Sequence, residues 1–121
     1  MIQLHREFLR AGSDVLQGFT FGGSDSTLEH KGSKYTSEEV NQAGVKLVKK
    51  VAAEGNALIA GSISRSWGYG SKGKDVVQEE FRKQAKIFAE NNMDFIICEV
   101  KFTNSKSYQK NSQSDFHPVV L

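Results

Sequence analysis

The sequence predicts an α/β fold in which three parallel strands alternate with helices. Three apolar runs with strand character start about 40 residues apart, at residues 14–21, 57–63 and 94–100, and a segment with helical periodicity precedes each run. Because strand–helix–strand crossovers are right-handed, we expect the three strands to lie parallel in one sheet. Three strands neither complete such a sheet nor close a barrel, so we expect an interior piece of a larger βα protein.

The first helix is predicted at the N-terminus, and Gly12 marks its end. Its apolar face consists of Ile2, Leu4, Phe8 and Leu9. His5 lies beside Arg6 and Glu7 and is expected at the surface. Two interpretations stay open here: a helix that lacks its first turns, or a short native helix. The strand predicted over residues 14–21 follows it, β-branched and aromatic in composition.

The second long helix is predicted to start with a capping box. The Thr36 hydroxyl is expected to accept a hydrogen bond from the Glu39 amide, while the Glu39 carboxylate reaches back to Thr36. Gly55 ends this helix, and a shorter helical turn is expected near Leu28, before Gly32. The apolar face of the long helix consists of Val40, Leu47, Val48 and Val51.

The last helix is predicted to begin at Asp75 as N-cap and to end at Asn91 and Asn92. Its apolar face consists of Val77, Phe81, Ala85 and Phe88. The third strand, residues 94–100, follows directly, so the order of elements is helix and strand in alternation.

Composition limits the class of protein. The chain has 121 residues, 25% of them charged, and a net charge of +2 with acidic and basic residues interspersed. It has no basic stripe that would neutralise a row of phosphates, so nucleic acid is not an expected partner. It has no apolar run of about 18 residues, so no membrane span is expected. The single cysteine, Cys98, allows no internal disulfide, and we expect a cytoplasmic location.

A glycine-rich loop spells the G-x-G-x-x-G pattern of dinucleotide-binding loops with Gly68, Gly70 and Gly73. Four residues separate Ile63, the end of the predicted strand, from Gly68, whereas the fingerprint places its first glycine directly at the strand end. The acidic cap Asp75 would also repel a phosphate at the helix N-terminus. A dinucleotide site is therefore the minor alternative, and a flexible loop above a site is the main one.

Glu99 is the most informative polar residue, because it lies near the C-terminal end of an apolar strand. Burying a carboxylate there is costly unless a cation or several donors pair with it, and this edge of a parallel βα sheet is where ligands bind. The alternatives are a solvated glutamate or a partner for a nearby lysine. Other polar and small residues at the corresponding strand ends are Thr20, Phe21, Gly22, Gly23, Ser62 and Ser64. A small polar ligand with an amine would fit this set, with Glu99 as its counter-ion.

Other catalytic constellations are weak. His5, His30 and His117 have no metal-ligand spacing among themselves, and no Ser-His-Asp arrangement is visible. Cys98 alternates away from Glu99 in its strand, so we expect it to pack in the core and not to react. We predict no catalytic and no metal-ligating residue in this chain.

Four segments resemble the homocysteine S-methyltransferase family: "QLHREFLRAGSDVLQGFTF", "EVNQAG", "AAEGNALIAGSIS" and "NNMDFIICE". The likeness runs in order from Ile2 to about Glu99, through all three βα units. It implies a (β/α)8 barrel, of which residues 1–100 would form a partial homocysteine-binding domain with roughly strands two to four. It also implies that Glu99 holds the amino group of homocysteine. In this family a zinc ion binds the homocysteine sulfur as thiolate, which attacks a methyl group of the donor. In betaine-using members, aromatic rings surround the quaternary ammonium.

The departures from the family are as informative as the likeness. The family's first strand, with an Asp-Gly-Gly segment, is absent, and so are the three zinc-binding cysteines. Gly22 and Val100 stand where betaine-site tyrosines are expected, which puts the methyl donor in doubt. The polar segment of residues 101–121 does not resemble the family and is predicted to be disordered.

Because of these departures, we expect an incomplete fragment that does not catalyse methyl transfer alone. The alternative is a non-catalytic module or truncated isoform that associates with itself or with a full-length relative.

Overall fold

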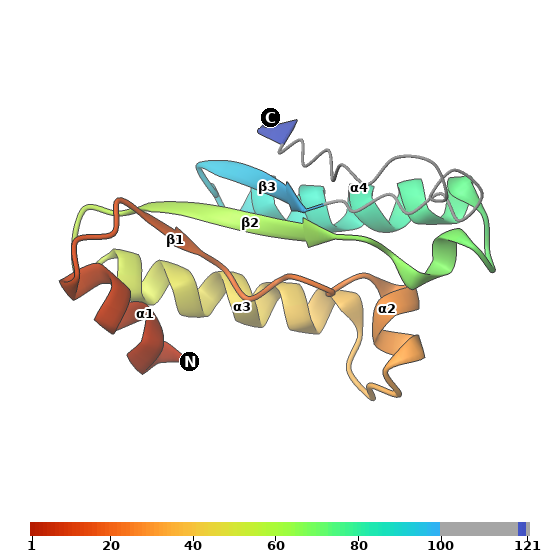
Figure 1. Cartoon of the computed structure of the whole chain (residues 1–121), viewed down its shortest axis with the longest axis horizontal. Helices are drawn as coiled ribbons and strands as arrows, with labels where there is room; N and C mark the ends of the chain where they lie inside the picture. Colours follow the sequence, from red (N-terminus) through yellow and green to blue (C-terminus); the bar gives the residue numbers. More distant parts are fainter. Residues whose placement is uncertain (100–118, 121) are drawn as a thin grey trace, which may run out of the picture.

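The computed structural model describes residues 1–99 and 119–120, and its strands form one four-stranded sheet (Figure 1). The strands lie in the order β1 (Val15–Gln17), β2 (Leu58–Ser64), β3 (Phe95–Glu99) and β4 (Val119–Val120). β1, β2 and β3 run parallel, as predicted, and β4 pairs antiparallel with β3. Apart from β4, the predicted disorder of residues 101–121 lies outside the described residues.

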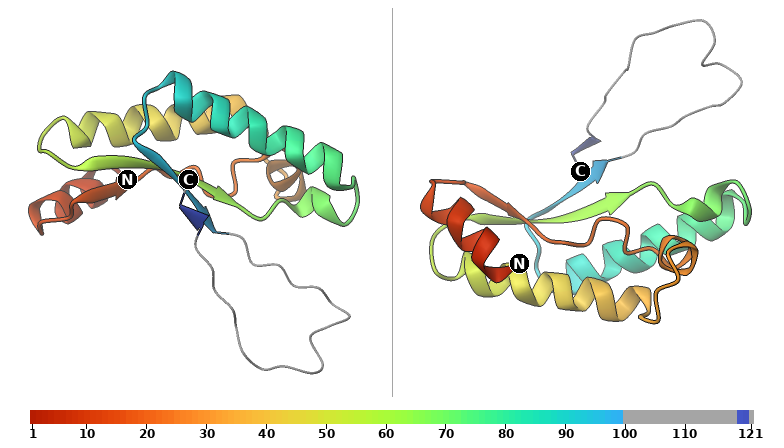
Figure 2. Two further views of the ribbon diagram at one scale, coloured as in Figure 1. Left: turned by 90° about the horizontal axis from the view of Figure 1, so that it is seen from above. Right: turned by 60° about the horizontal axis from the view of Figure 1, so that its bottom comes forward.

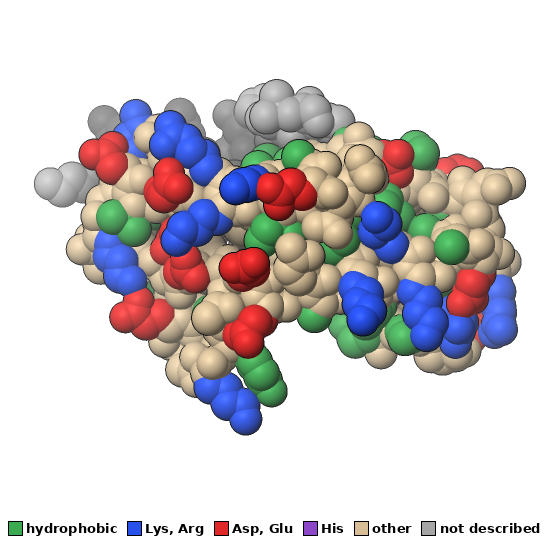
Figure 3. Space-filling model, turned by 180° about the vertical axis from the view of Figure 1, so that it is seen from behind, with side chains coloured by type: hydrophobic (Ala, Val, Ile, Leu, Met, Phe, Trp, Pro, Cys, Tyr) green, Lys and Arg blue, Asp and Glu red, His purple; other side chains and the backbone are tan. Residues whose placement is uncertain are grey.

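Two long helices, α3 (Ser37–Ala52) and α4 (Lys74–Glu90), cover one face of the sheet (Figure 2). The shorter helices are α1 (Ile2–Arg10), which packs on α3, and α2 (Asp25–His30), which contacts the 3-10 turn η1 (Trp67–Tyr69). None of the helices in the described ranges is long and apolar enough to cross a membrane. Acidic and basic side chains are interspersed on the surface seen from behind (Figure 3).

The core lies between the sheet and these two helices. One cluster comprises Leu16, Val48, Val51 and Ile59, and a second comprises Val45, Ile63, Ile87 and Phe88. Gly61 of β2 faces Phe88, and a Cβ atom at Gly61 would lie 2.5 Å from the phenylalanine ring. Only glycine lets β2 approach α4 this closely.

The ends of the helices confirm one sequence prediction and correct another. The capping box of α3 is present: the Thr36 hydroxyl accepts from the Glu39 amide at 3.2 Å, and the Glu39 carboxylate accepts from the Thr36 amide at 2.8 Å. α4 begins two residues earlier than predicted, with Gly73 in place of Asp75 as N-cap, at φ +88°, and with Asp75 in the first turn. A positive φ suits glycine, so the backbone geometry decides this helix start.

The buried faces of α3 and α4 are more polar than predicted. On α3, Val40 and Leu47 are only half-buried, and the buried positions are Ser37, Asn41, Gly44, Val45, Val48 and Val51. On α4, Phe81 and Ala85 are half-buried, and the buried positions are Val77, Glu80, Gln84, Ile87 and Phe88. The buried polar side chains lie toward the C-terminal edge of the sheet, where they bind loop backbone.

The first strand is shorter than the predicted residues 14–21. Ladder bonding reaches Gly18, whose amide donates to the Ala60 carbonyl at 2.8 Å, and the chain then turns away. Beyond Gly18, the Thr20 side chain replaces the backbone hydrogen bonds between the strands. Its hydroxyl donates to the Ser62 carbonyl and accepts from the Ser62 amide, both at 2.8 Å. A side chain thus satisfies two backbone groups of β2 that a longer β1 would have paired.

The predicted surface position of His5 is wrong. Its side chain is 4% exposed and packs against Phe19 with ring centroids 5.1 Å apart, while Leu4 and Phe8 of the predicted apolar face are 45% and 52% exposed. The imidazole Nε2 is buried and has no hydrogen-bond partner among the described residues. Burial, and then the nearby N-terminal ammonium, lower the pKa of His5 below its usual value of 6.5.

We predict that the free energy of unfolding decreases on acidification, because folding lowers the pKa of His5. Its pKa is lower in the folded than in the unfolded chain, so the unfolded chain binds the proton first as the pH falls below about 6.5. The stabilising contribution of neutral His5 is complete above that pH and is lost as the pH falls further, through the lowered pKa of the folded chain. We expect His5→Phe to reduce the slope of unfolding free energy against pH in urea denaturation between pH 7 and 5. Equal slopes for the variant and the parent chain would contradict this.

Candidate functional site

The candidate site lies where the parallel strands end, on the sheet face that α3 and α4 leave uncovered. The register pairs Ser62 with Ile97 and Ser64 with Glu99 across β2 and β3. Paired residues in a parallel sheet point to the same face, and side chains alternate along each strand. Ser62, Ser64 and Glu99 therefore share one face, while Ile63 and Cys98 pack with the helices.

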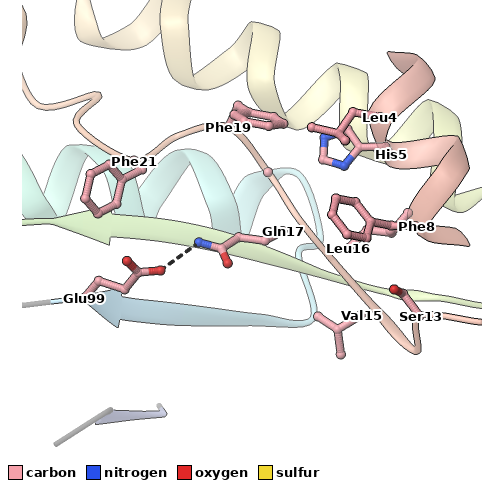
Figure 4. A pocket seen from close by; sticks show the side chains of 11 residues that line it. Leu4, His5, Phe8, Ser13, Val15, Leu16, Gln17, Phe19, Phe21 and Glu99 are labelled. Atoms are coloured by element: carbon pink, nitrogen blue, oxygen red, sulfur yellow. Dashed lines mark hydrogen bonds between the residues drawn. The ribbon is translucent and has the colours of Figure 1, made fainter. Parts of the chain in front are cut away.

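Gln17 of β1 links to β2 and to β3, and Figure 4 shows its contact with Glu99. Its amide Nε2 donates to the Ser62 hydroxyl at 2.8 Å and to Glu99 Oε1 at 3.1 Å. Glu99 is half-buried, and the residues that the structure describes place no lysine, arginine or histidine nitrogen within 4.0 Å of it. The carboxylate is thus oriented by a neutral donor and keeps its negative charge for a cationic group.

The predicted lining residues come together around this bridge. Thr20 binds the backbone of Ser62, and the Gly22 amide donates to the Ser64 hydroxyl at 2.8 Å. Thr20, Gly22, Ser62 and Ser64 are buried, whereas the Phe21 ring is 56% exposed. Sequence reasoning missed Gln17. Its alternation with buried Leu16 in the strand was the available signal.

Two buried side-chain amides, on α3 and α4, anchor the loop after β1. Asn41 Nδ2 donates to the Gly23 carbonyl at 2.9 Å and to the Ser37 carbonyl at 2.7 Å, and Gln84 Nε2 donates to Asn41 Oδ1 at 3.0 Å. A Cβ atom on Gly23 would lie 2.9 Å from Asn41 Nδ2 and from the Thr20 carbonyl oxygen. The loop therefore needs glycine at this position.

A buried carboxylate ties the loops after β1 and β2 together. Glu80 is 4% exposed and accepts from the Ser26 amide at 2.8 Å, from the Ser26 hydroxyl, and from the Ser66 hydroxyl at 2.6 Å. Three donors meet one buried charge, which offsets much of its desolvation cost. The connection that carries Gly22 and the loop that follows Ser64 are thereby held together.

An apolar groove of about 590 Å³ opens beside Glu99 (Figure 4). Its walls come from α1, β1 and the loop after β1, and they include the exposed rings of Phe8, Phe19 and Phe21. A charged group at Glu99 and an apolar chain in the groove are compatible with a small amphipathic ligand.

The site does not fit a metal ion. Within residues 1–99 and 119–120, no three His, Cys, Asp or Glu side chains cluster as metal ligands. Cys98 packs against the core, as predicted, and burial raises the pKa of its thiol. The described residues therefore contain no set of ligands for the zinc ion that the family resemblance implies.

The glycine loop does not support a dinucleotide site. Gly68 is buried against Ser26, and its amide donates to the Ser66 hydroxyl at 3.1 Å. The Gly68 carbonyl accepts from the amides of Ser71 and Lys72, so these backbone groups are hydrogen-bonded within the turn. Asp75 stands in the first turn of α4, where its charge opposes a phosphate.

Comparison with known proteins identifies the family. The sequence model of the homocysteine S-methyltransferase family matches residues 1–107. Betaine–homocysteine S-methyltransferase 1 of Danio rerio is 47% identical over 100 residues, covering 80% of this chain and 25% of that protein. The protein of the same name from Sus scrofa is 45% identical over 102 residues, covering 80% and 37%, and that from Xenopus tropicalis is 46% identical over 102 residues, covering 80% and 25%.

The chain therefore belongs to the homocysteine S-methyltransferase family. It spans a quarter of the length of the Danio rerio relative.

Thr20 provides a test of how β1 and β2 are joined at the site. Thr20→Val keeps the shape of the side chain but leaves the amide and carbonyl of Ser62 without partners. We expect a loss of about 1–3 kcal/mol in the free energy of unfolding, measured by urea denaturation. Thr20→Ser keeps the hydroxyl and is the matched control, with a smaller loss. Equal losses for both variants would show that the hydroxyl bonds contribute nothing.

Proposed function

We propose that this chain supplies the homocysteine-binding edge of a homocysteine S-methyltransferase, and that its three βα units belong to a (β/α)8 barrel formed by residues 1–100 with further strands. One observation supports the proposal above all: the Gln17 amide donates a hydrogen bond to the Glu99 carboxylate at the strand end and orients it without neutralising its charge. Family membership supports homocysteine as the ligand.

In the proposed reaction the amine of homocysteine, protonated at neutral pH, binds Glu99. The homocysteine thiol releases its proton to solvent, the sulfur lone pair forms a bond to a methyl carbon of the donor, and the bond from that carbon to the donor breaks with its electron pair staying on the donor. With betaine as donor the products are methionine and dimethylglycine. A zinc ion, implied by the family, would stabilise the thiolate. The described residues do not fit it, and their part is to bind and orient the substrate.

The methyl donor is proposed to be betaine or a similar methylated amine. The names of the relatives support betaine. Gly22 offers no aromatic ring to a quaternary ammonium, while exposed Phe21 lies beside Glu99 in the groove. We also propose a cytoplasmic location, on the strength of the single cysteine.

A chimera tests the transfer reaction. Residues 1–100 of this chain would replace the matching segment of the Danio rerio relative, and methionine formation from L-homocysteine would be measured. We expect turnover by the chimera and none by the isolated chain. Glu99→Gln in the chimera should raise KM for homocysteine by about 30-fold or more, since the ligand ammonium loses its counter-ion. A chimera that melts within a few degrees of the relative but forms no methionine would contradict the proposal, as would an unchanged KM.

The exposed apolar side chains favour a second candidate function: association with another copy or with a full-length relative. Leu4, Phe8, Val15, Phe19 and Phe21 are 37–56% exposed around the groove. β1 has β2 as its one neighbour in the described sheet, which leaves a strand edge for pairing.

Sedimentation equilibrium tests this second candidate. We expect self-association that Phe8→Ser weakens, because the substitution removes apolar surface from the groove. Trp67→Ser is the control, because Trp67 is 53% exposed but lies outside the groove. A parent chain that stays monomeric at about 100 μM would contradict association.

A further inference from the structure

We propose that Lys31 and Ser64 form a carboxylate-binding subsite opposite Glu99, so that the site takes zwitterionic small molecules. The inference rests on the proposed function, because it adds a second charged contact to the same site. The carboxylate belongs either to homocysteine itself or to a methyl donor such as betaine.

Gly22 lies next to both the Lys31 ammonium and the Ser64 hydroxyl. A Cβ atom on Gly22 would lie 3.1 Å from Lys31 Nζ and 4.0 Å from Ser64 Oγ. Gly22 has φ +73°, which a side chain would strain, so this position adds no side chain of its own between the ammonium and the hydroxyl, and the Thr27 methyl lies 3.5 Å from the same point. A cation and a hydroxyl that converge in this way are suited to a carboxylate.

The backbone that carries Lys31 is well anchored. Lys31 follows α2 directly, and its amide donates to the Thr27 carbonyl at 3.1 Å. The Glu80 carboxylate binds the first turn of α2 through the Ser26 amide. The flexible part of the contact is therefore the Lys31 side chain alone, which can adjust to a ligand.

Among the residues that the structure describes, Lys31 has no carboxylate partner. On α2, Asp25 pairs with Lys83 at 3.3 Å and Glu29 pairs with Lys72. No carboxylate of the described residues lies within 4.0 Å of Lys31 Nζ. Nearby acids are already engaged, so the Lys31 ammonium is available to an anion from solution.

Ser64 has a hydrogen to donate to that anion. Its hydroxyl oxygen accepts from the Gly22 amide at 2.8 Å, and its other contact, to the Arg65 carbonyl, is long at 3.5 Å. A ligand carboxylate oxygen within hydrogen-bond distance of Ser64 Oγ would therefore receive a stronger hydrogen bond than the Arg65 carbonyl does.

The strand register places the Ser64 hydroxyl beside the Glu99 carboxylate. Ser64 and Glu99 are register partners on adjacent parallel strands, about 4.8 Å apart. An amine and a carboxylate on one carbon can bridge such neighbours, with the amine toward Glu99 and the carboxylate toward Ser64 and Lys31. This arrangement would favour an α-amino acid over a simple amine or a simple acid.

Ligand titration of the 121-residue chain tests the subsite, with the amide NMR signals of Gly22 and Ser64 as readout. The probes are L-homocysteine, 4-mercaptobutyrate, which lacks the amine, 3-amino-1-propanethiol, which lacks the carboxylate, and betaine. We expect Lys31→Met to weaken binding of homocysteine and 4-mercaptobutyrate about five- to tenfold and to leave 3-amino-1-propanethiol unchanged. Lys34→Met, at an exposed lysine that lies over the Tyr35 ring, is the matched control and should leave all four unchanged.

The pattern of losses identifies the source of the carboxylate. A loss for homocysteine and 4-mercaptobutyrate assigns it to homocysteine, and a loss confined to betaine assigns it to the methyl donor. The subsite is disproved if Lys31→Met changes no affinity more than twofold, if it weakens 3-amino-1-propanethiol equally, or if no probe moves either signal.

Glu99→Gln separates this inference from the proposed function. It should weaken the amine-bearing thiols and spare 4-mercaptobutyrate. If Glu99→Gln has no effect, the amine contact fails, while the response of 4-mercaptobutyrate to Lys31→Met still decides the subsite.

Discussion

The candidate site depends on the two hydrogen bonds of the Gln17 side-chain amide. Gln17 ends β1, Glu99 ends β3, and Ser62 belongs to the strand between them, so one amide links all three strands. It orients Glu99 without supplying a charge, which leaves the carboxylate ready for a cationic ligand. If the register of β2 and β3 slipped by one residue, Glu99 would turn to the helix-covered face and the link would be lost.

Buried polar side chains position the loops that surround this link. Asn41 and Gln84 hold the loop after β1, and Glu80 joins it to the loop after β2. Such groups are costly to bury unless every donor and acceptor is matched, and partial matching would favour other loop arrangements. They make the C-terminal edge of the sheet a defined surface, while purely apolar packing supports the opposite edge at Leu16, Val48, Val51 and Ile59.

The sequence predicted the alternation of helices and strands because apolar periodicity and the Thr36–Glu39 capping box are local signals. It also predicted that Thr20, Gly22, Ser62 and Ser64 gather at one edge, since parallel strands bring their ends together. It failed for His5, whose polarity suggests the surface but whose burial depends on a tertiary contact with Phe19. It did not single out Glu80, whose burial depends on contacts with Ser26 and Ser66. It missed Gln17 because its bond to Glu99 spans 82 residues, which no local pattern encodes.

The role of Glu99 as the counter-ion of a substrate amine is the central claim. A crystal structure of the 121-residue chain with L-homocysteine tests it most directly, through the distance from the ligand nitrogen to the nearer Glu99 oxygen. We predict about 2.7–3.2 Å, with the Gln17 contact to Glu99 retained. Ligand bound with its amine remote from Glu99, or a protein lysine paired with that carboxylate in its place, would contradict the claim.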